Sequence, residues 1–208
     1  MSEFKYYRPN NFPPIVKNLI IINVLVWLAQ NVFDEKYNLT AKLALYPFNT
    51  PLFQPYQIAT HMFAHGPLYH ILFNMFGLWM FGKVLENVWG PKRFLLFYLI
   101  CGVGAAVVHL GVEYFTGGYS AAVGASGAIM GIFAAFGYLF PNTKLYIMFI
   151  PIPVKAKWAM IGLAAIDLFG GVAKVSGDNI AHFAHLGGAL TGFILVLIWN
   201  KTNRKTFY

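Results

Sequence analysis

The stretch "AAVGASGAIMG", residues 121–131, holds a single hydroxyl, that of Ser126, among alanines, glycines and apolar side chains. The surrounding chain has 208 residues, of which 58% are hydrophobic and 11% charged, whereas a soluble domain has about 25% charged residues. Apolar stretches long enough to cross a hydrocarbon core of about 30 Å as helices recur along it. Six membrane spans are expected, at residues 15–33, 68–86, 94–115, 121–140, 154–172 and 180–200. The sequence therefore predicts an all-α, multi-pass integral membrane protein with one domain over residues 1–208 and short terminal tails.

Basic residues alternate between the two sides of these spans. Twelve lie on the side of the termini: Lys5, Arg8, Lys17, Lys83, Lys92, Arg93, Lys144, Lys155, Lys157, Lys201, Arg204 and Lys205. The opposite side carries Lys36, Lys42 and Lys174. The positive-inside rule then predicts both termini in the cytoplasm, and we expect a bacterial cytoplasmic membrane. Nucleic acid is not an expected partner of this chain of net charge +8, because a phosphate-binding stripe would not alternate with span number.

The connection between the first two spans, residues 34–67, is long and too polar to cross a membrane. It combines four prolines with aromatic residues, namely Pro47, Pro51, Pro55, Pro67, Tyr46, Phe48, Phe53 and Tyr56. Long loops in compact proteins are commonly functional. Aromatic rings favour the boundary between membrane and water. We expect a membrane-associated loop on or in the outer leaflet.

Polar side chains inside the spans are costly and usually face a cavity or one another. Counting 1.5 Å per residue from the inner ends of their spans places Ser126 roughly 22 Å and His185 roughly 24 Å above the inner boundary. His70 and Asn74 lie near the outer end of the second span, at a similar height. The four side chains are thus predicted in one layer, several ångströms below the outer face.

Two G-x-x-x-G pairs occur in the same spans: Gly127 with Gly131, and Gly188 with Gly192. Small residues at this spacing let helix backbones approach closely in lipid. His185 continues the helical face of the second pair. If the two glycine faces meet, the imidazole points at the Ser126 hydroxyl.

Each polar residue has a structural alternative. A serine beside glycines is more often a packing residue that bonds its own backbone. A histidine in a span is as often a structural partner as a functional one, and His70 with Asn74, at i and i+4, could bridge two helices. Their common depth favours a shared site, because independent packing residues have no reason to share one level.

Such a set supports acyl transfer. A serine hydroxyl is a weak nucleophile unless a base takes its proton, and histidine does so near neutral pH. Asn, His and backbone N–H groups can stabilise the oxyanion, and the N–H groups near Ser126 at the start of its helix lack intrahelical partners. Counting residues places Asp167, in the fifth span, nearer the middle of the membrane than His185. A Ser-His dyad without an acid is therefore expected.

Three motifs resemble one family, the rhomboid intramembrane serine proteases. They are "HMFAHGPLYHILFNM" (61–75), "GASG" (124–127) and "AHLGGALTG" (184–192), in that order, and Gly82 with Glu86 adds a G-x-x-x-E pair at the end of the second span. The resemblance covers about residues 56–199. It implies a six-transmembrane-helix rhomboid-like bundle.

The resemblance also implies roles for the polar residues. Ser126 would be the nucleophile and His185 the general base, later the general acid. His70, Asn74 and the Ser126 backbone N–H would stabilise the oxyanion. The substrates implied are transmembrane segments of other membrane proteins, cleaved near small and helix-weakening residues, without cofactor or metal, and entering between the second and fifth helices.

The remaining motif residues are assigned supporting roles by the same resemblance. These residues are His61, His65, Gly124, Gly127, Gly188, Gly192 and Met130. His61 and His65 would be structural or would retain water. His182 is a second candidate base, but it lies off the glycine spacing. In the family, an aromatic often occupies the position of Met130, and a Trp-Arg pair that of Tyr56 and Gln57, so stacking on the histidine and anchoring of the outer loop are expected to differ.

Two other functions remain as alternatives. His61 and His65, at i and i+4, could ligate a metal or haem, but no H-E-x-x-H motif and no carboxylate accompany them, and Cys101 is the single cysteine. A catalytically silent rhomboid-like protein that binds membrane clients is the other alternative.

Overall fold

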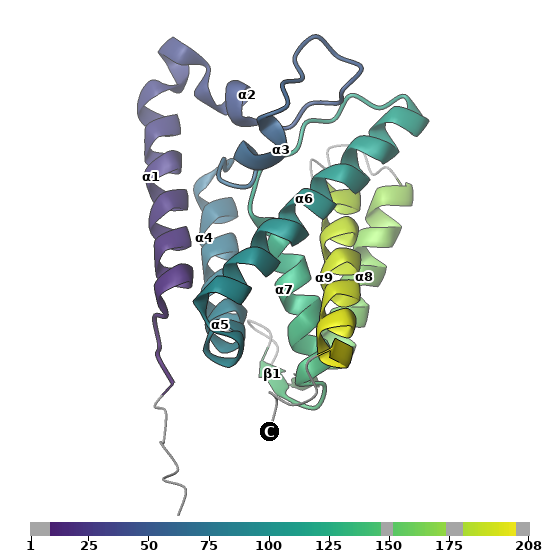
Figure 1. The fold of residues 1–208 in the computed structure, drawn as a ribbon. Coiled ribbons are helices and arrows are strands. Elements are labelled where there is room, and N and C mark those ends of the chain that lie inside the picture. The colour runs from purple at the N-terminus through teal and green to yellow at the C-terminus, as the bar shows by residue number, and fades with distance from the viewer. Residues whose placement is uncertain (1–8, 147–151, 174–180, 203–208) are drawn as a thin grey trace, which may run out of the picture.

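Helices dominate the computed structural model, which describes residues 9–146, 152–173 and 181–202 (Figure 1). Five helices in these residues are long and apolar enough to cross a membrane: α1 (Pro14–Tyr37), the continuous helix formed by α4 (Leu68–Gly77), η1 (Leu78–Gly82) and α5 (Lys83–Trp89), α6 (Pro91–Thr116), α8 (Ala156–Ala173) and α9 (His182–Thr202). The expected start of the sixth span, residue 180, lies outside the described residues. So do Lys5, Arg8, Lys174, Arg204 and Lys205.

The fourth expected span, residues 121–140, is shorter than predicted. Its helix, α7 (Ser126–Leu139), has 14 residues and is about 21 Å long. Gly124 has φ +118°, which breaks the helix just before Ser126, and its N–H donates to the His61 carbonyl at 2.8 Å. The segment before α7 pairs instead with the outer loop through a bridge between Leu45 and Ala122. Six stretches were expected to span the membrane. In the described residues five helices reach spanning length, and the shorter α7 is surrounded by them (Figure 1).

A β-hairpin precedes α8 and corrects the purely helical prediction. Strand β1 (Lys144–Tyr146) pairs antiparallel with β2 (Pro153–Lys155). The Ala156 N–H donates to the Thr143 carbonyl at 2.9 Å, which fixes where the hairpin ends and the helix begins. The fifth helix therefore starts at Ala156, two residues after the predicted start.

The glycine faces of α7 and α9 pack against each other, as predicted. A Cβ atom on Gly188 would overlap the Gly127 carbonyl oxygen, and one on Gly192 would lie 2.5 Å from the Gly131 oxygen. Only hydrogen side chains allow backbones this close. This contact sets the spacing between the two helices that carry the serine and the histidine.

The loop between α1 and α4 contains two short helices, α2 (Leu39–Leu43) and α3 (Gln57–Thr60). The buried Gln57 side chain holds the loop together. Its amide oxygen accepts from the Gln54 N–H at 3.1 Å, and its amide nitrogen donates to the Leu52 carbonyl at 3.0 Å. The resemblance implied an arginine at this position, whereas the glutamine present there bonds to backbone groups of the loop itself. Tyr56 beside it is half exposed.

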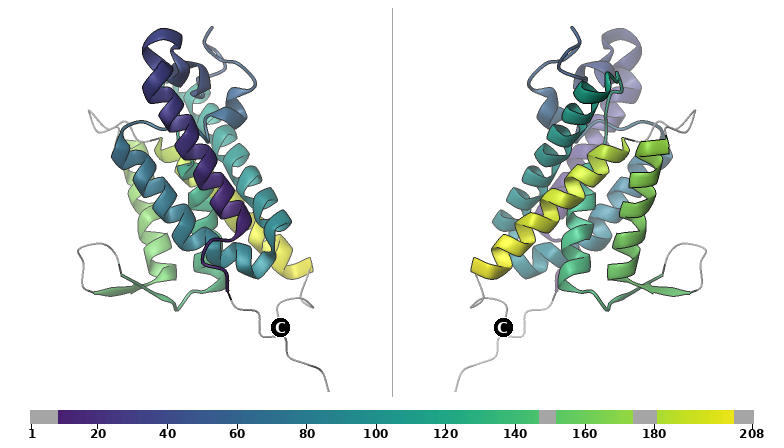
Figure 2. Two further views of the ribbon diagram at one scale, coloured as in Figure 1. Left: turned by 90° about the vertical axis from the view of Figure 1, so that its left-hand side faces the viewer. Right: turned by 90° about the vertical axis from the view of Figure 1, so that its right-hand side faces the viewer.

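The N-terminal end of α1 and the C-terminal end of α9 lie at the same end of the bundle, together with β1 and β2 (Figure 2). There the buried Glu86 of α5 caps α1. Its carboxylate accepts from the Ile15 and Val16 N–H groups at 2.9 and 2.8 Å. An anion at a helix N-terminus satisfies unpaired N–H groups and complements the helix dipole. The G-x-x-x-E pair thus ties the first span to the second.

Candidate functional site

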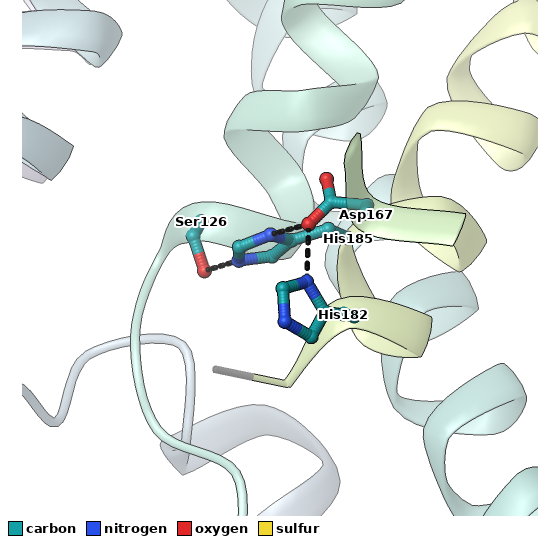
Figure 3. A network of polar contacts seen from close by, with 4 residues as sticks. All are labelled: Ser126, Asp167, His182 and His185. Carbon is teal, nitrogen blue, oxygen red and sulfur yellow. Dashed lines mark hydrogen bonds and ion pairs between the residues drawn. The ribbon is translucent and has the colours of Figure 1, made fainter. Parts of the chain in front are cut away.

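Ser126 and His185 face each other across the α7–α9 contact. The Ser126 Oγ lies 2.8 Å from the His185 Nε2, within hydrogen-bond distance (Figure 3). Ser126 is the first residue of α7, and His185 lies in the first turn of α9. The predicted meeting of the Ser126 hydroxyl and the His185 imidazole is confirmed.

A pocket of about 680 Å³ opens beside this pair. Its lining includes the two members of the pair together with His70, Asn74 and Met130, from α4 and α7. The four polar residues expected in one layer therefore border one cavity. Met130, which replaces the aromatic typical of the family, borders it as well.

His70 presents a proton donor near the segment that precedes Ser126. Its Nδ1 accepts from the Gly66 N–H at 3.2 Å, so in the neutral ring the proton resides on Nε2. A Cβ atom on Gly124 would lie 2.8 Å from that Nε2. The glycine at this position allows the ring to approach the backbone.

Asn74 is buried beside the pocket. Its Nδ2 donates one hydrogen bond to the His70 carbonyl at 2.8 Å. An amide nitrogen carries two N–H groups, so one remains for a bound group. Its buried Oδ1 has no partner within the described part of the chain.

Asp167 contradicts the expectation that no acid orients His185. Its Oδ1 lies 3.0 Å from the His185 Nδ1 and 2.8 Å from the His182 Nδ1 (Figure 3). Asp167 lies 11 residues above the start of α8 at Ala156, a rise of about 16.5 Å, against about 19.5 Å for Ser126 above Leu139. That difference is within the reach of side chains, which a count of backbone levels leaves out. The signal in the sequence that could have identified it was a lone carboxylate within the apolar stretch of residues 154–172, since such a group needs polar partners.

His61 holds the segment that leads to Ser126. Its Nδ1 donates to the Gln57 carbonyl at 2.8 Å, and its own carbonyl accepts from the Gly124 N–H. Burial lowers the pKa of His61 to about 4, so the ring is neutral at pH 7. This geometry supports the structural role expected of His61.

His65 is fixed in a similar way. The Gln30 amide brackets its backbone, accepting from the His65 N–H at 2.9 Å and donating to the His65 carbonyl at 3.0 Å. The Ala125 N–H makes a long hydrogen bond, 3.5 Å, to the His65 Nε2. Burial, and to a smaller extent the neighbouring His70, lower the pKa of His65 to about 4.

These contacts bear on the metal alternative. The Nδ1 atoms of His61 and His65 face the backbone carbonyls of Gln57 and Phe63. Across the three described ranges, no three His, Cys, Asp or Glu side chains are grouped so that they could hold a metal ion. No observation therefore favours metal or haem binding.

The long apolar helices define a multi-pass membrane protein, and the pocket between them is bordered by a serine beside a histidine. The chain belongs to the rhomboid family, because the Rhomboid domain matches residues 52–201. Many members of this family are serine proteases.

Three relatives illustrate the similarity. The presenilin-associated rhomboid-like protein, mitochondrial, of Homo sapiens is 33% identical over 192 residues, which cover 89% of this chain and 50% of that protein. Rhomboid-like protein 11, chloroplastic, of Arabidopsis thaliana is 33% identical over 192 residues, covering 88% and 64%. Rhomboid protein 1, mitochondrial, of Saccharomyces cerevisiae is 29% identical over 134 residues, covering 64% and 38%. The chain spans about half the length of the human relative and less than two thirds of the other two.

Proposed function

We propose that this protein is an intramembrane serine endopeptidase that cleaves transmembrane segments of other membrane proteins. The observation that carries the proposal is the 2.8 Å approach of the Ser126 Oγ to the His185 Nε2 beside a pocket among apolar helices. A base within hydrogen-bond distance is what a serine hydroxyl needs to become a nucleophile.

In the proposed acylation, the Ser126 Oγ forms a bond to the scissile carbonyl carbon while its proton passes to the His185 Nε2. The carbonyl oxygen becomes an oxyanion. When the tetrahedral intermediate collapses, the C–N bond breaks and His185 gives its proton to the leaving amine. In deacylation a water molecule attacks the ester, its proton passes to His185, and the C–Oγ bond breaks as the proton returns to Ser126.

The oxyanion requires donors that are in place before the reaction. We assign this role to the His70 Nε2–H, the remaining Asn74 N–H and the Ser126 backbone N–H. Both side chains line the same pocket as the nucleophile. Removal of one such donor typically costs about 10²- to 10³-fold in kcat.

The proposed substrate path lies within the membrane. In this proposal residues 1–208 act as one domain of six spans, in which α7 is the short fourth span, and the basic end of the bundle faces the cytoplasm. Substrate helices enter between the second span and α8. The largely lipid-exposed α8, with Phe169 73% exposed and Trp158 58% exposed, supports entry on that side.

The proposal is tested with purified protein in vesicles that contain a model transmembrane substrate. We expect the Ser126→Ala and His185→Ala variants each to abolish cleavage, and a fluorophosphonate probe to label Ser126 in the native chain only. Normal cleavage by Ser126→Ala would refute the assignment. If the native chain neither cleaves nor reacts with the probe but still binds the substrate, it acts instead as a client-binding protein.

A further inference from the structure

One carboxylate oxygen in the membrane-spanning region serves two imidazoles. The Oδ1 of Asp167 lies 3.0 Å from the Nδ1 of His185 and 2.8 Å from the Nδ1 of His182 (Figure 3). A carboxylate only accepts hydrogen bonds when ionised, so each of these contacts requires a proton on the Nδ1 atom. Each histidine is therefore held with Nδ1 as its donor.

For His185, this arrangement decides which nitrogen is free. With Nδ1 protonated, the neutral ring leaves the Nε2 lone pair facing the Ser126 hydroxyl, which can then donate to it. The opposite tautomer would place a proton on Nε2 and block the transfer. A carboxylate at this position would also stabilise the imidazolium that forms when His185 takes the proton.

We propose that Asp167 is a positioning residue that holds His185 in the tautomer able to accept the Ser126 proton, and that His182 in turn holds Asp167. This inference rests on the proposed function and goes beyond a Ser-His dyad. Asp167 stays ionised throughout, and no proton passes to it. It acts through His185 and does not touch the substrate.

The packing of α8 supports the second half of the proposal. Ala156 and Asp167 are the buried residues of this helix in the described structure, so the carboxylate is sheltered on a helix whose other side chains are half-buried or exposed. Such a group is tolerated in a membrane where hydrogen-bond donors meet it. Two imidazoles from one turn of α9 supply these donors.

Gly170, one turn beyond Asp167, makes room for the His182 ring. A Cβ atom on Gly170 would lie 2.5 Å from the Cε1 and Nε2 atoms of that ring. An alanine there would push His182 away from Asp167 without altering a chemical group in the site. A Cβ atom on Gly162, on the same helix, would meet no atom within 4 Å, so Gly162→Ala is the matched control.

The first experiment measures cleavage kinetics and ring tautomers in the same variants. An asparagine at position 167 keeps the shape of the side chain but loses the charge. For Asp167→Asn we expect kcat to fall about 10²- to 10⁴-fold with KM within about twofold, because the substrate contacts are unchanged. In the ¹⁵N spectrum of histidine-labelled protein, the Nδ1–H form of His185 should be lost. A purely structural role would not change the tautomer of a folded variant.

The second experiment tests the role of His182 separately from the role of the Asp167 charge. We expect Gly170→Ala to lower kcat about 10-fold and Gly162→Ala to leave it unchanged. If Asp167→Asn and Gly170→Ala both retain native kcat and the native His185 tautomer while Ser126→Ala is inactive, the inference is overturned and the proposed protease function stands. If Ser126→Ala itself cleaves, the proposed function fails and the inference with it. Should Asp167→Asn fail to fold, the tautomer and kcat of Gly170→Ala decide the matter alone.

Discussion

Replacing Gly188 with alanine tests whether the close α7–α9 contact sets the geometry of the site. The new Cβ atom would lie 2.6 Å from the carbonyl carbon and 3.1 Å from the Cα atom of Gly127, the residue after Ser126. Backbone atoms cannot rotate away, and carbon atoms pack at about 3.5–4 Å, so α9 has to retreat by about 1 Å. His185 lies one turn from Gly188 and moves with it.

The retreat would lengthen the Oγ–Nε2 distance from 2.8 Å to about 3.8 Å, beyond hydrogen-bond range. A misplacement of about 1 Å in a reacting group can cost about 10²-fold in rate. We therefore expect kcat of Gly188→Ala to fall about 10²-fold or more on a fluorogenic transmembrane substrate in vesicles.

The control for Gly188→Ala is Gly111→Ala on α6, where a new Cβ atom would meet no atom within 4 Å and activity should be unchanged. Gly192→Ala, two turns from His185, should cause a smaller loss. A folded Gly188→Ala variant with native kcat would refute the reasoning, because the glycine contact would then not determine the distance between the Ser126 Oγ and the His185 Nε2.

Four further outcomes are expected. Gly124→Ala forces a side chain onto φ +118°, so we expect about 1–3 kcal/mol less stability in thermal unfolding and weaker activity. Gln30→Leu removes the hydrogen bonds to the backbone N–H and carbonyl of His65, so the unfolding temperature in detergent should fall. Ser126→Ala serves as the control and should unfold as the native chain does. Burial lowers the pKa of His61 and of His65 from 6.5 to about 4 in the folded state, so the unfolded state binds more protons between these two values. The contribution of each histidine to the free energy of unfolding should therefore be full above pH 6.5, fall by about 3 kcal/mol as the pH drops from 6.5 to 4, and change little below that. Asn74→Ala should reduce kcat about 10²-fold or more in the same cleavage assay, and an unchanged rate would count against its oxyanion role.

The site was predictable to the extent that helices convert sequence spacing into position. A fixed rise of 1.5 Å per residue placed Ser126 and His185 at one level, and the G-x-x-x-G spacing predicted which helical faces meet. These two regularities together predicted that the two side chains face each other, and in the structure their reacting atoms lie 2.8 Å apart. Predicting this approach of Ser126 and His185 required no knowledge of how the loops fold.

The boundaries of the fourth and fifth helices were not predictable in the same way. Apolar composition continues from residue 121 into α7, but the start of the helix is decided by the positive φ of Gly124 and by its hydrogen bond to the carbonyl of His61, 63 residues earlier. The hairpin before α8 likewise depends on pairing between Lys144 and Lys155, two like charges that no sequence pattern favours as neighbours. Long-range contacts determined both boundaries.

Asp167 shows which reasoning about membrane proteins is the more robust. Its level along the helix argued against a contact with His185, whereas the cost of a carboxylate in lipid argued that it must have partners nearby. The energetic argument was the correct one, because a carboxylate and an imidazole together extend several ångströms from their backbones, more than the difference of about 3 Å between the counted levels of Asp167 and Ser126. A count of helical levels should therefore exclude a polar pair only when the separation exceeds the combined length of the two side chains. By this criterion Asp167 would have been retained as a partner of His185, and the sequence would have predicted a serine, a histidine and an acid.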